Sequence, residues 1–218
     1  MFTRLYAREK LRRDPIYFSL LQRGVIPDGA RVLDLGCGQG LLLALLVAAR
    51  DAARAGVWPS GWAPAPVVSS LRGIELDPGE VRRARLALGS EATVEEADLC
   101  DAKLPPSDVI ALVDVIHYLR PAQQERLLAS VAEALAPGGL LLLRICDAAA
   151  GRRAFLTRAG DYLGTLTKRG HLGRLHLRSA AEWIARLEAL GLAVDAQPMS
   201  AGTPFANVLL AARKPALA

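Results

Sequence analysis

The chain has 218 residues, of which 52% are hydrophobic and 22% are charged. That length and apolar content suit one folded domain with a two-sided core and exclude a largely disordered chain. The longest uncharged apolar runs are much shorter than the roughly 20 residues that span a bilayer, so we expect no membrane span.

The net charge of +5 is unevenly distributed along the chain. Residues 1–23 carry six basic and two acidic side chains, and residues 150–178 carry seven basic and one acidic side chain. The remainder has 14 basic and 19 acidic residues and is therefore acidic. An acidic body favours a positively charged ligand, and the two basic segments predict an anionic substrate or partner.

Cysteine usage and the first residues indicate a compartment. The three cysteines, Cys37, Cys100 and Cys146, contain no C-x-x-C pair, which is typical of a reducing environment. Residues 1–23 have charges throughout and no apolar segment, so we expect no secretory signal. We therefore expect a cytoplasmic protein.

The first segment, residues 2–23, predicts a basic helix that is interrupted at Asp14 and Pro15. Asp14 can cap a second helix in which Pro15 takes the first position. This segment either lies over a ligand or forms a solvated basic arm with Tyr17 in the core. The apolar face after the break consists of Tyr17, Phe18, Leu20 and Leu21.

The most informative stretch is R-V-L-D-L-G-C-G-Q-G at residues 31–40. It predicts a buried strand over residues 31–35, a turn with three alternate glycines, and a helix from Leu41 to about Ala55. Glycines at such a turn remove the Cβ atoms that would hold a ligand away from the backbone. We therefore expect a cofactor against this turn, at the carboxyl end of the strand.

The glycine spacing narrows the choice of cofactor. The sixth place of a G-x-G-x-x-G pattern is Leu41, and no G-x-x-x-x-G-K-[ST] loop occurs, so neither a dinucleotide nor a nucleoside triphosphate is favoured. The stretch V-L-D-L-G-C-G-Q-G instead resembles motif I of the class I S-adenosylmethionine methyltransferases. A related nucleotide-binding fold and a relative that binds without catalysing are the alternatives. The resemblance implies S-adenosylmethionine as cofactor, bound in part by Asp34, Gly36, Cys37, Gly38 and Gly40.

The second expected strand, residues 71–75, ends in Glu75. The resemblance implies that Glu75 binds the cofactor's ribose hydroxyls and that Leu76 lies beside them, whereas Asp77 caps the next helix, which runs to Leu88. Glu75 is 35 residues beyond the last glycine because a Pro/Gly/Trp-rich insertion at 57–66 precedes the strand. Its tryptophans, Trp58 and Trp62, line a substrate mouth, contact another subunit or pin the loop to the body.

The third strand, residues 93–97, is followed by Asp98 and Leu99. The resemblance implies that the Asp98 carboxylate accepts a hydrogen bond from the adenine amine, with the Leu99 backbone N–H on the ring. The fourth strand, residues 108–113, has the continuous apolar run of a buried parallel strand. The resemblance adds Leu112, from this strand, to the cofactor-binding residues.

The fourth strand leads into D-V-I-H-Y-L, residues 114–119. A neutral His117 could remove a proton from a hydroxyl nucleophile, or could pack and cap the following turn. Asp114 would orient the cofactor's ammonium or the substrate, and we place both residues in the catalytic set. The [DN]-P-P-[FYW] tetrad is missing, which argues against methylation of DNA or RNA amino groups. From the leading helix, Tyr17 or Arg13 is implied to reach the methionine carboxylate.

The rest of the chain completes an α/β pattern. A-P-G-G at residues 136–139 predicts a turn into a fifth strand over 140–145, and a helix over 179–190 precedes two closing strands at 192–197 and 206–213, one of them antiparallel. Between the fifth strand and this helix, residues 148–178 form a basic connection that either caps the substrate side or is a solvated loop. Its histidines, His171 and His176, match no zinc spacing, so we expect no metal.

Together these patterns predict a single α/β domain with a doubly wound, mostly parallel seven-stranded sheet. Its parts are a helical arm (1–30), a cofactor-binding core (31–147), a cap insertion (148–178) and a closing helix and strands (179–218). More narrowly, the chain resembles small bacterial methyltransferases found with aryl-polyene or fatty-acid-like biosynthesis enzymes.

We expect an enzyme that methylates an oxygen or activated carbon of a small metabolite, acidic or carrier-bound, aromatic or acyl. The alternatives are an RNA methyltransferase that uses the basic surface and a non-catalytic regulator that binds S-adenosylmethionine.

Overall fold

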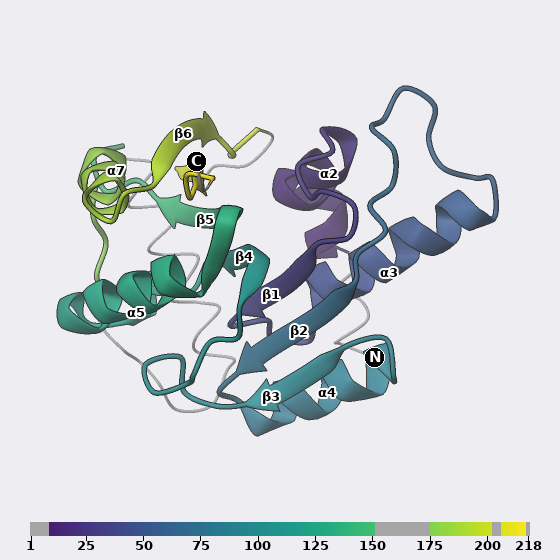
Figure 1. The fold of residues 1–218 in the computed structure, drawn as a ribbon, viewed down its shortest axis with the longest axis horizontal. Coiled ribbons are helices and arrows are strands. Elements are labelled where there is room, and N and C mark those ends of the chain that lie inside the picture. The colour runs from purple at the N-terminus through teal and green to yellow at the C-terminus, as the bar shows by residue number, and fades with distance from the viewer. Residues whose placement is uncertain (1–8, 151–174, 202–205, 217–218) are drawn as a thin grey trace.

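The computed structural model describes residues 9–150, 175–201 and 206–216, and these form a seven-stranded sheet between two layers of helices (Figure 1). Residues 9–13 are helical and precede α2. The strands are β1 (Arg31–Leu35), β2 (Ser70–Glu75), β3 (Thr93–Glu96), β4 (Ser107–Val113), β5 (Leu135–Cys146), β6 (Ala193–Pro198) and β7 (Asn207–Arg213). The helices are α2 (Pro15–Gln22), α3 (Leu41–Arg54), α4 (Pro78–Leu88), η1 (Ile116–Tyr118), α5 (Pro121–Ala134) and α7 (Ala180–Ala189).

The strand order is β3-β2-β1-β4-β5-β7-β6. Neighbouring strands from β3 to β5 are parallel, and β7 is antiparallel to both β5 and β6. The predicted doubly wound sheet with one antiparallel strand is therefore confirmed. After β1 the chain winds outward through β2 and β3 and then returns to place β4 on the other side of β1. This reversal makes the carboxyl end of β1 the switch point, where open α/β sheets bind ligands.

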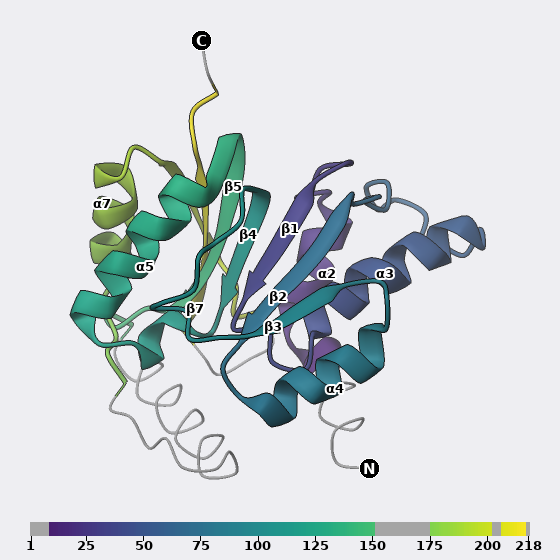
Figure 2. The same ribbon diagram turned by 60° about the horizontal axis from the view of Figure 1, so that its bottom comes forward.

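Side chains of the central strands alternate between two cores. Val109 and Ala111 of β4 pack with the residues of α2, α3 and α4, whereas Ile110 and Leu112 pack with those of α5 and α7. Figure 2 shows these two groups of helices on opposite sides of the sheet. A strand buried on both faces needs apolar residues at every position, which explains the continuous apolar run of β4.

The helix ends follow the capping residues of the sequence. The Asp14 carboxylate accepts a hydrogen bond from the Ile16 N–H at 3.3 Å and caps α2. Asp77 accepts from the N–H groups of Gly79 and Glu80 at 2.7 and 2.9 Å and caps α4, as predicted. Ser179 caps α7 in the same way. No helix in the described part of the chain is long and apolar enough to cross a membrane.

The start of β5 differs from the prediction. We expected A-P-G-G to form a turn before a strand from Leu140, but β5 begins at Leu135 and contains these residues. Its pairing with β4 jumps from Ser107–Leu135 to Val109–Leu140, so the extra residues bulge out of the ladder. Gly138, with a backbone φ of +75°, permits the bulge because residues other than glycine rarely adopt that angle.

The tryptophan-rich insertion packs on α2. Trp58 and Trp62 meet edge to face with ring centroids 5.5 Å apart, and Trp62 meets Phe18 of α2 at 6.0 Å. The Trp58 indole N–H donates to the Ala63 carbonyl at 2.9 Å, which closes the loop on itself. Of the three interpretations of these tryptophans, these contacts support the one in which they pin the loop to the body.

Candidate functional site

The site lies at the carboxyl ends of β1, β2, β3 and β4, which meet at one edge of the sheet because these strands are parallel (Figure 2). This edge gathers the glycine turn after β1, Glu75 at the end of β2, Asp98 after β3 and Asp114 after β4. The topology thus brings together residues that are up to 80 positions apart in the sequence, counting from Asp34 to Asp114.

The three glycines of the turn have different surroundings. A Cβ atom on Gly36 would lie 2.5 Å from Val115 Cγ2, so packing requires glycine there. One on Gly40 would lie 2.7 Å from the flexible end of Leu88, and its φ of +75° is what favours glycine at this position. A Cβ atom on Gly38 would meet nothing within 4 Å. Gly38 also has a φ of +54°, which glycine tolerates best. The backbone at Gly38 is therefore the part of the turn that a ligand can approach.

Glu75 binds this open part of the turn. Its Oε2 accepts a hydrogen bond from the Gly38 N–H at 2.9 Å, and its Oε1 accepts from the N–H groups of Leu76 and Asp77 at 2.8 and 2.9 Å. A carboxylate offers about four acceptor positions, so one remains on Oε2 for a further donor. The carboxylate is therefore held in place by backbone groups before any ligand hydroxyl reaches it.

Asp34 is a buried acid beside this carboxylate, with a relative exposure of 5%. Burial, together with the nearby charge of Glu75, raises the pKa of Asp34 to about 7, and the positive charge of Lys10 opposes that rise. Asp34 is therefore an acid whose ionisation a bound cation would favour near neutral pH.

Asp114 belongs to a buried charge network that the sequence did not predict. Arg144 of β5, only 1% exposed, donates from Nε to Asp114 Oδ1 at 2.8 Å and from a terminal nitrogen to Asp14 Oδ2 at 2.7 Å. The Lys10 Nζ lies 3.6 Å from Asp114 Oδ2. Burial alone would raise the pKa of Asp114, but the charges of Arg144 and Lys10 hold it below its usual range. The sequence signal was a lone arginine in the apolar run of β5.

Two residues of the leading segment lie elsewhere than the resemblance implied. The Arg13 side chain is 80% exposed and pairs with Glu9 at 2.9 Å, on the outside of the arm. Tyr17 is only 6% exposed and belongs to the core under α2, where burial raises its pKa to about 12. This placement matches the second interpretation of the segment, in which Tyr17 is a core residue.

His117 lies in η1, three residues after Asp114, and is 4% exposed. Burial lowers the pKa of His117, with the charge of Asp114 opposing and that of Arg144 adding to the effect, so the imidazole is neutral at physiological pH. The ring packs on Tyr118 with centroids 4.4 Å apart. A neutral imidazole can accept a proton, as the proposed base requires.

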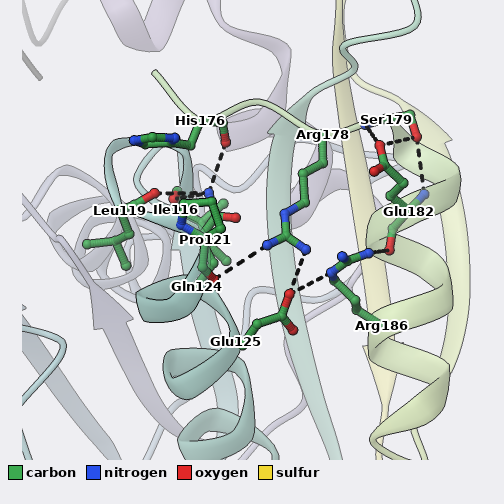
Figure 3. Close-up of polar contacts among 10 residues, drawn as sticks. All are labelled: Ile116, Leu119, Pro121, Gln124, Glu125, His176, Arg178, Ser179, Glu182 and Arg186. Carbon is green, nitrogen blue, oxygen red and sulfur yellow. Dashed lines mark hydrogen bonds and ion pairs between the residues drawn. The ribbon is translucent and has the colours of Figure 1, made fainter. Parts of the chain in front are cut away.

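The loop that carries His117 is held by one buried glutamine. Gln124 of α5 is fully buried, and its Nε2 approaches the carbonyls of Ile116, Leu119 and His176 at 3.1, 3.1 and 2.9 Å (Figure 3). The His176 N–H in turn donates to the His117 carbonyl at 2.8 Å. Gln124 therefore fixes both the η1 loop and the chain that returns after the basic insertion.

The returning chain is also fixed by charge. Arg178 pairs with Glu125 of α5 at 2.6 Å (Figure 3). Its guanidinium carbon also lies 5.1 Å from the ring centroid of Trp183. Most of the basic insertion, residues 151–174 with His171, lies outside the described residues. Within the described residues, no group of three histidine, cysteine, aspartate or glutamate side chains could bind a metal ion.

The remaining predicted residues divide by exposure. Asp98 is exposed, and its carboxylate accepts from the Cys100 N–H at 2.8 Å. Leu76 is 55% exposed beside Glu75. The side chains of Leu99 and Leu112 belong instead to the core under α5 and α7, and Leu112 is fully buried, so its side chain is a core residue of the sheet. Cys37 is buried too, which raises its thiol pKa.

The chain is similar to known proteins over most of its length. A family model described as a methyltransferase domain matches residues 4–197. A carboxy-S-adenosyl-L-methionine synthase of Chromohalobacter salexigens is 32% identical over 120 residues, 53% of this chain and 39% of that protein. A trans-aconitate 2-methyltransferase of Methylobacterium nodulans is 29% identical over 188 residues, 81% of this chain and 62% of that protein. The matched part of the chain is therefore less than two thirds of either relative.

The fold has solved counterparts. An O-methyltransferase family protein from Burkholderia thailandensis superposes with a TM-score of 0.68 at 22% identity, over 99% of this chain and 59% of that one. At that identity the likeness concerns the fold, whereas the family model covers most of this chain. The chain belongs to the methyltransferase-domain family, and its fold is that of the class I S-adenosylmethionine-dependent methyltransferases, whose cofactor is S-adenosylmethionine.

Proposed function

We propose that the protein is an S-adenosylmethionine-dependent methyltransferase that methylates an oxygen or activated carbon of a small, acidic or carrier-bound aromatic or acyl metabolite. The observation that carries the proposal is the carboxylate of Glu75, which is held against the open Gly38 backbone at the switch point of the sheet. This arrangement suits a ligand that has hydroxyl groups for the carboxylate to bind and a tail that lies against bare protein backbone.

The residues present fit the cofactor. The acceptor position left on Glu75 Oε2 suits a ribose hydroxyl, and the exposed Asp98 carboxylate suits the adenine amine. Asp34 suits the ammonium of the methionine tail because it is a buried acid beside the turn. When bound, the cofactor supplies a methyl group attached to a sulfonium, from which a neutral thioether departs readily as the leaving group. The chain's task is then mainly to align acceptor and cofactor.

The acidic character of the acceptor is inferred from charge. Residues 150–178 have seven basic side chains and one acidic side chain, and the described end of this segment bonds to the η1 loop through the His176 N–H. Such a segment attracts anions. A relative that matches over 81% of this chain is named for trans-aconitate, an organic anion.

His117 is proposed as the base that accepts the acceptor's proton. Replacing it with alanine is expected to lower turnover by roughly 100-fold, the lower end for general base catalysis, with cofactor binding unchanged. His176→Ala is the matched control, because the contact of His176 with the η1 loop uses its backbone. Methyl transfer and cofactor titration would be measured on both variants. A fully active His117→Ala protein would mean that His117 only packs.

Cofactor affinity should depend on the ionisation of Asp34. Because its raised pKa is about 7, the carboxyl is increasingly protonated below that pH, and a proton must leave before a cation can bind beside it. We expect affinity to fall by roughly tenfold per pH unit below about pH 7 and to level off above it.

Calorimetric titration of S-adenosylmethionine between about pH 6 and about pH 8 would measure this dependence. The Asp34→Asn variant cannot ionise at this position and should give a flat profile over the same range. A wild-type profile as flat as that of the variant would show that Asp34 does not contact the ammonium.

The activity itself can be tested with methyl-labelled S-adenosylmethionine. The protein would be incubated with small organic anions, with acyl-loaded carrier protein and with RNA, and the label would be followed into each. Transfer to a small or carrier-bound molecule is expected. Transfer to RNA alone, with binding that weakens steeply with salt, would replace the proposal with an RNA methyltransferase. Cofactor binding without transfer to any component of a cell extract would indicate a regulator.

A further inference from the structure

The methionine tail of the proposed cofactor has one ammonium and one carboxylate, so its site needs a cation as well as an acid. Asp34 and Asp114 supply the acids at the switch point. The two residues expected from the sequence do not fit, because the guanidinium of Arg13 pairs with Glu9 on the outside and the phenol of Tyr17 is buried in the core. A different residue must therefore face the carboxylate.

Lys10 lies where such a residue is needed. Its Nζ is 3.6 Å from Asp114 Oδ2, and its side chain is 26% exposed. The residue after Asp114 is Val115, whose side chain closes against Gly36 so tightly that a Cβ there would lie 2.5 Å away. The ammonium of Lys10 therefore lies at the carboxyl end of β4, whose following residue packs against the glycine turn. Its charge also acts on Asp34, on the neighbouring strand.

Arg144, the other cation of this network, is a poorer partner for a ligand. It is 1% exposed, and its guanidinium already binds the carboxylates of Asp14 and Asp114. Lys10 is more exposed and forms a longer contact with Asp114, which keeps its bonds from Arg144 if Lys10 turns toward a ligand. Asp114 therefore keeps a cation when Lys10 turns away.

The backbone of Lys10 is held by the same network. The Asp14 N–H donates to the Lys10 carbonyl at 2.9 Å, and the Asp14 carboxylate is bound by Arg144. The position of the arm helix at residues 9–13 is thereby tied to β5. A lysine fixed at its backbone, with a flexible side chain at the site, suits the capture of a carboxylate as a point charge.

We propose that the ammonium of Lys10 binds the α-carboxylate of S-adenosylmethionine. The inference rests on the proposed function and adds to it a cofactor-binding residue from the arm. The binding is balanced in charge: the ligand ammonium takes an acid at the end of β1, and the ligand carboxylate takes the lysine that otherwise pairs with Asp114.

The test compares two ligands on three proteins by calorimetric titration. S-adenosylmethionine has the carboxylate, and decarboxylated S-adenosylmethionine lacks it but keeps the sulfonium and the ammonium. The proteins are wild type, Lys10→Met and Arg12→Met. Arg12 is the matched control because it is an exposed cation on the same short helix.

Wild type is expected to bind S-adenosylmethionine at least tenfold more tightly than the decarboxylated ligand, about 1.4 kcal/mol. Lys10→Met should lose about tenfold for the first ligand and less than about twofold for the second, whereas Arg12→Met should behave as wild type. Equal losses for both ligands, or no loss for either, would overturn the inference. Retained binding of the decarboxylated ligand proves that Lys10→Met is folded, and failure of wild type to bind either ligand would instead refute the proposed function.

Discussion

Glu75→Ala is expected to weaken the binding of S-adenosylmethionine by at least tenfold, about 1.4 kcal/mol. Two losses combine in this variant. The ligand loses a charged acceptor for its ribose, and the Gly38 N–H loses the carboxylate that orients the open part of the turn. Charge-assisted hydrogen bonds of this kind are roughly twice as strong as neutral ones, so a second side chain nearby is not expected to compensate.

Glu96→Ala is the matched control for this prediction. Glu96 pairs in register with Glu75 at the end of the neighbouring strand β3, but its side chain is exposed. Calorimetric titration of both variants, with thermal unfolding measured alongside, would separate a binding defect from a folding defect. An affinity of Glu75→Ala within twofold of wild type would show that Glu75 only supports the turn.

Arg144→Met is expected to lower the free energy of unfolding by about 3–5 kcal/mol, because Asp14 loses the buried cation that binds it and Asp114 keeps only the longer contact with Lys10. Both carboxylates, Asp14 and Asp114, depend on this one guanidinium. For a domain of this size the loss corresponds to a fall in melting temperature of roughly 6–20 °C. Chemical and thermal denaturation would measure it.

Arg31→Met provides the control for Arg144. Arg31 also forms a bidentate pair, with Asp108, but the Arg31 side chain is 45% exposed whereas that of Arg144 is 1% exposed, so a much smaller effect is expected. Combining Arg144→Met with Asp14→Asn should cost less than the sum of the two single changes, since the second removes a charge that the first left unpaired. Strict additivity would contradict the proposed network.

Much of the fold could be predicted from the sequence because its signals are local. The apolar run of β4 indicates a strand covered on both faces, and the Asp14-Pro15 and Asp77-Pro78 pairs begin helices at those residues, as the structure confirms. The bulge at the start of β5 was missed because A-P-G-G is equally compatible with a turn. Its register with β4 depends on a partner strand far away in the sequence.

The candidate site was only partly predictable for the same reason. Asp34, Gly38 and Glu75 stand at strand ends, and the sequence places all of them at the sheet edge where the structure finds them. The roles of Gln124 and Lys10 have no local signature, and the lone arginine in the apolar run of β5 does not identify the partners of Arg144. Each depends on contacts across the fold, such as the pair of Asp14 with Arg144, which are 130 residues apart.

By itself the sequence determined the family and the sheet edge where the cofactor is proposed to bind, because a glycine-rich turn between a buried strand and a helix is specified by adjacent residues. Only the tertiary structure decided which charges share that edge: it placed Tyr17 in the core, turned Arg13 outward and left Lys10 beside Asp114. The physical reason is that the pairing of buried charges depends on which strand ends and helices come together, and that arrangement is a property of the whole packed sheet.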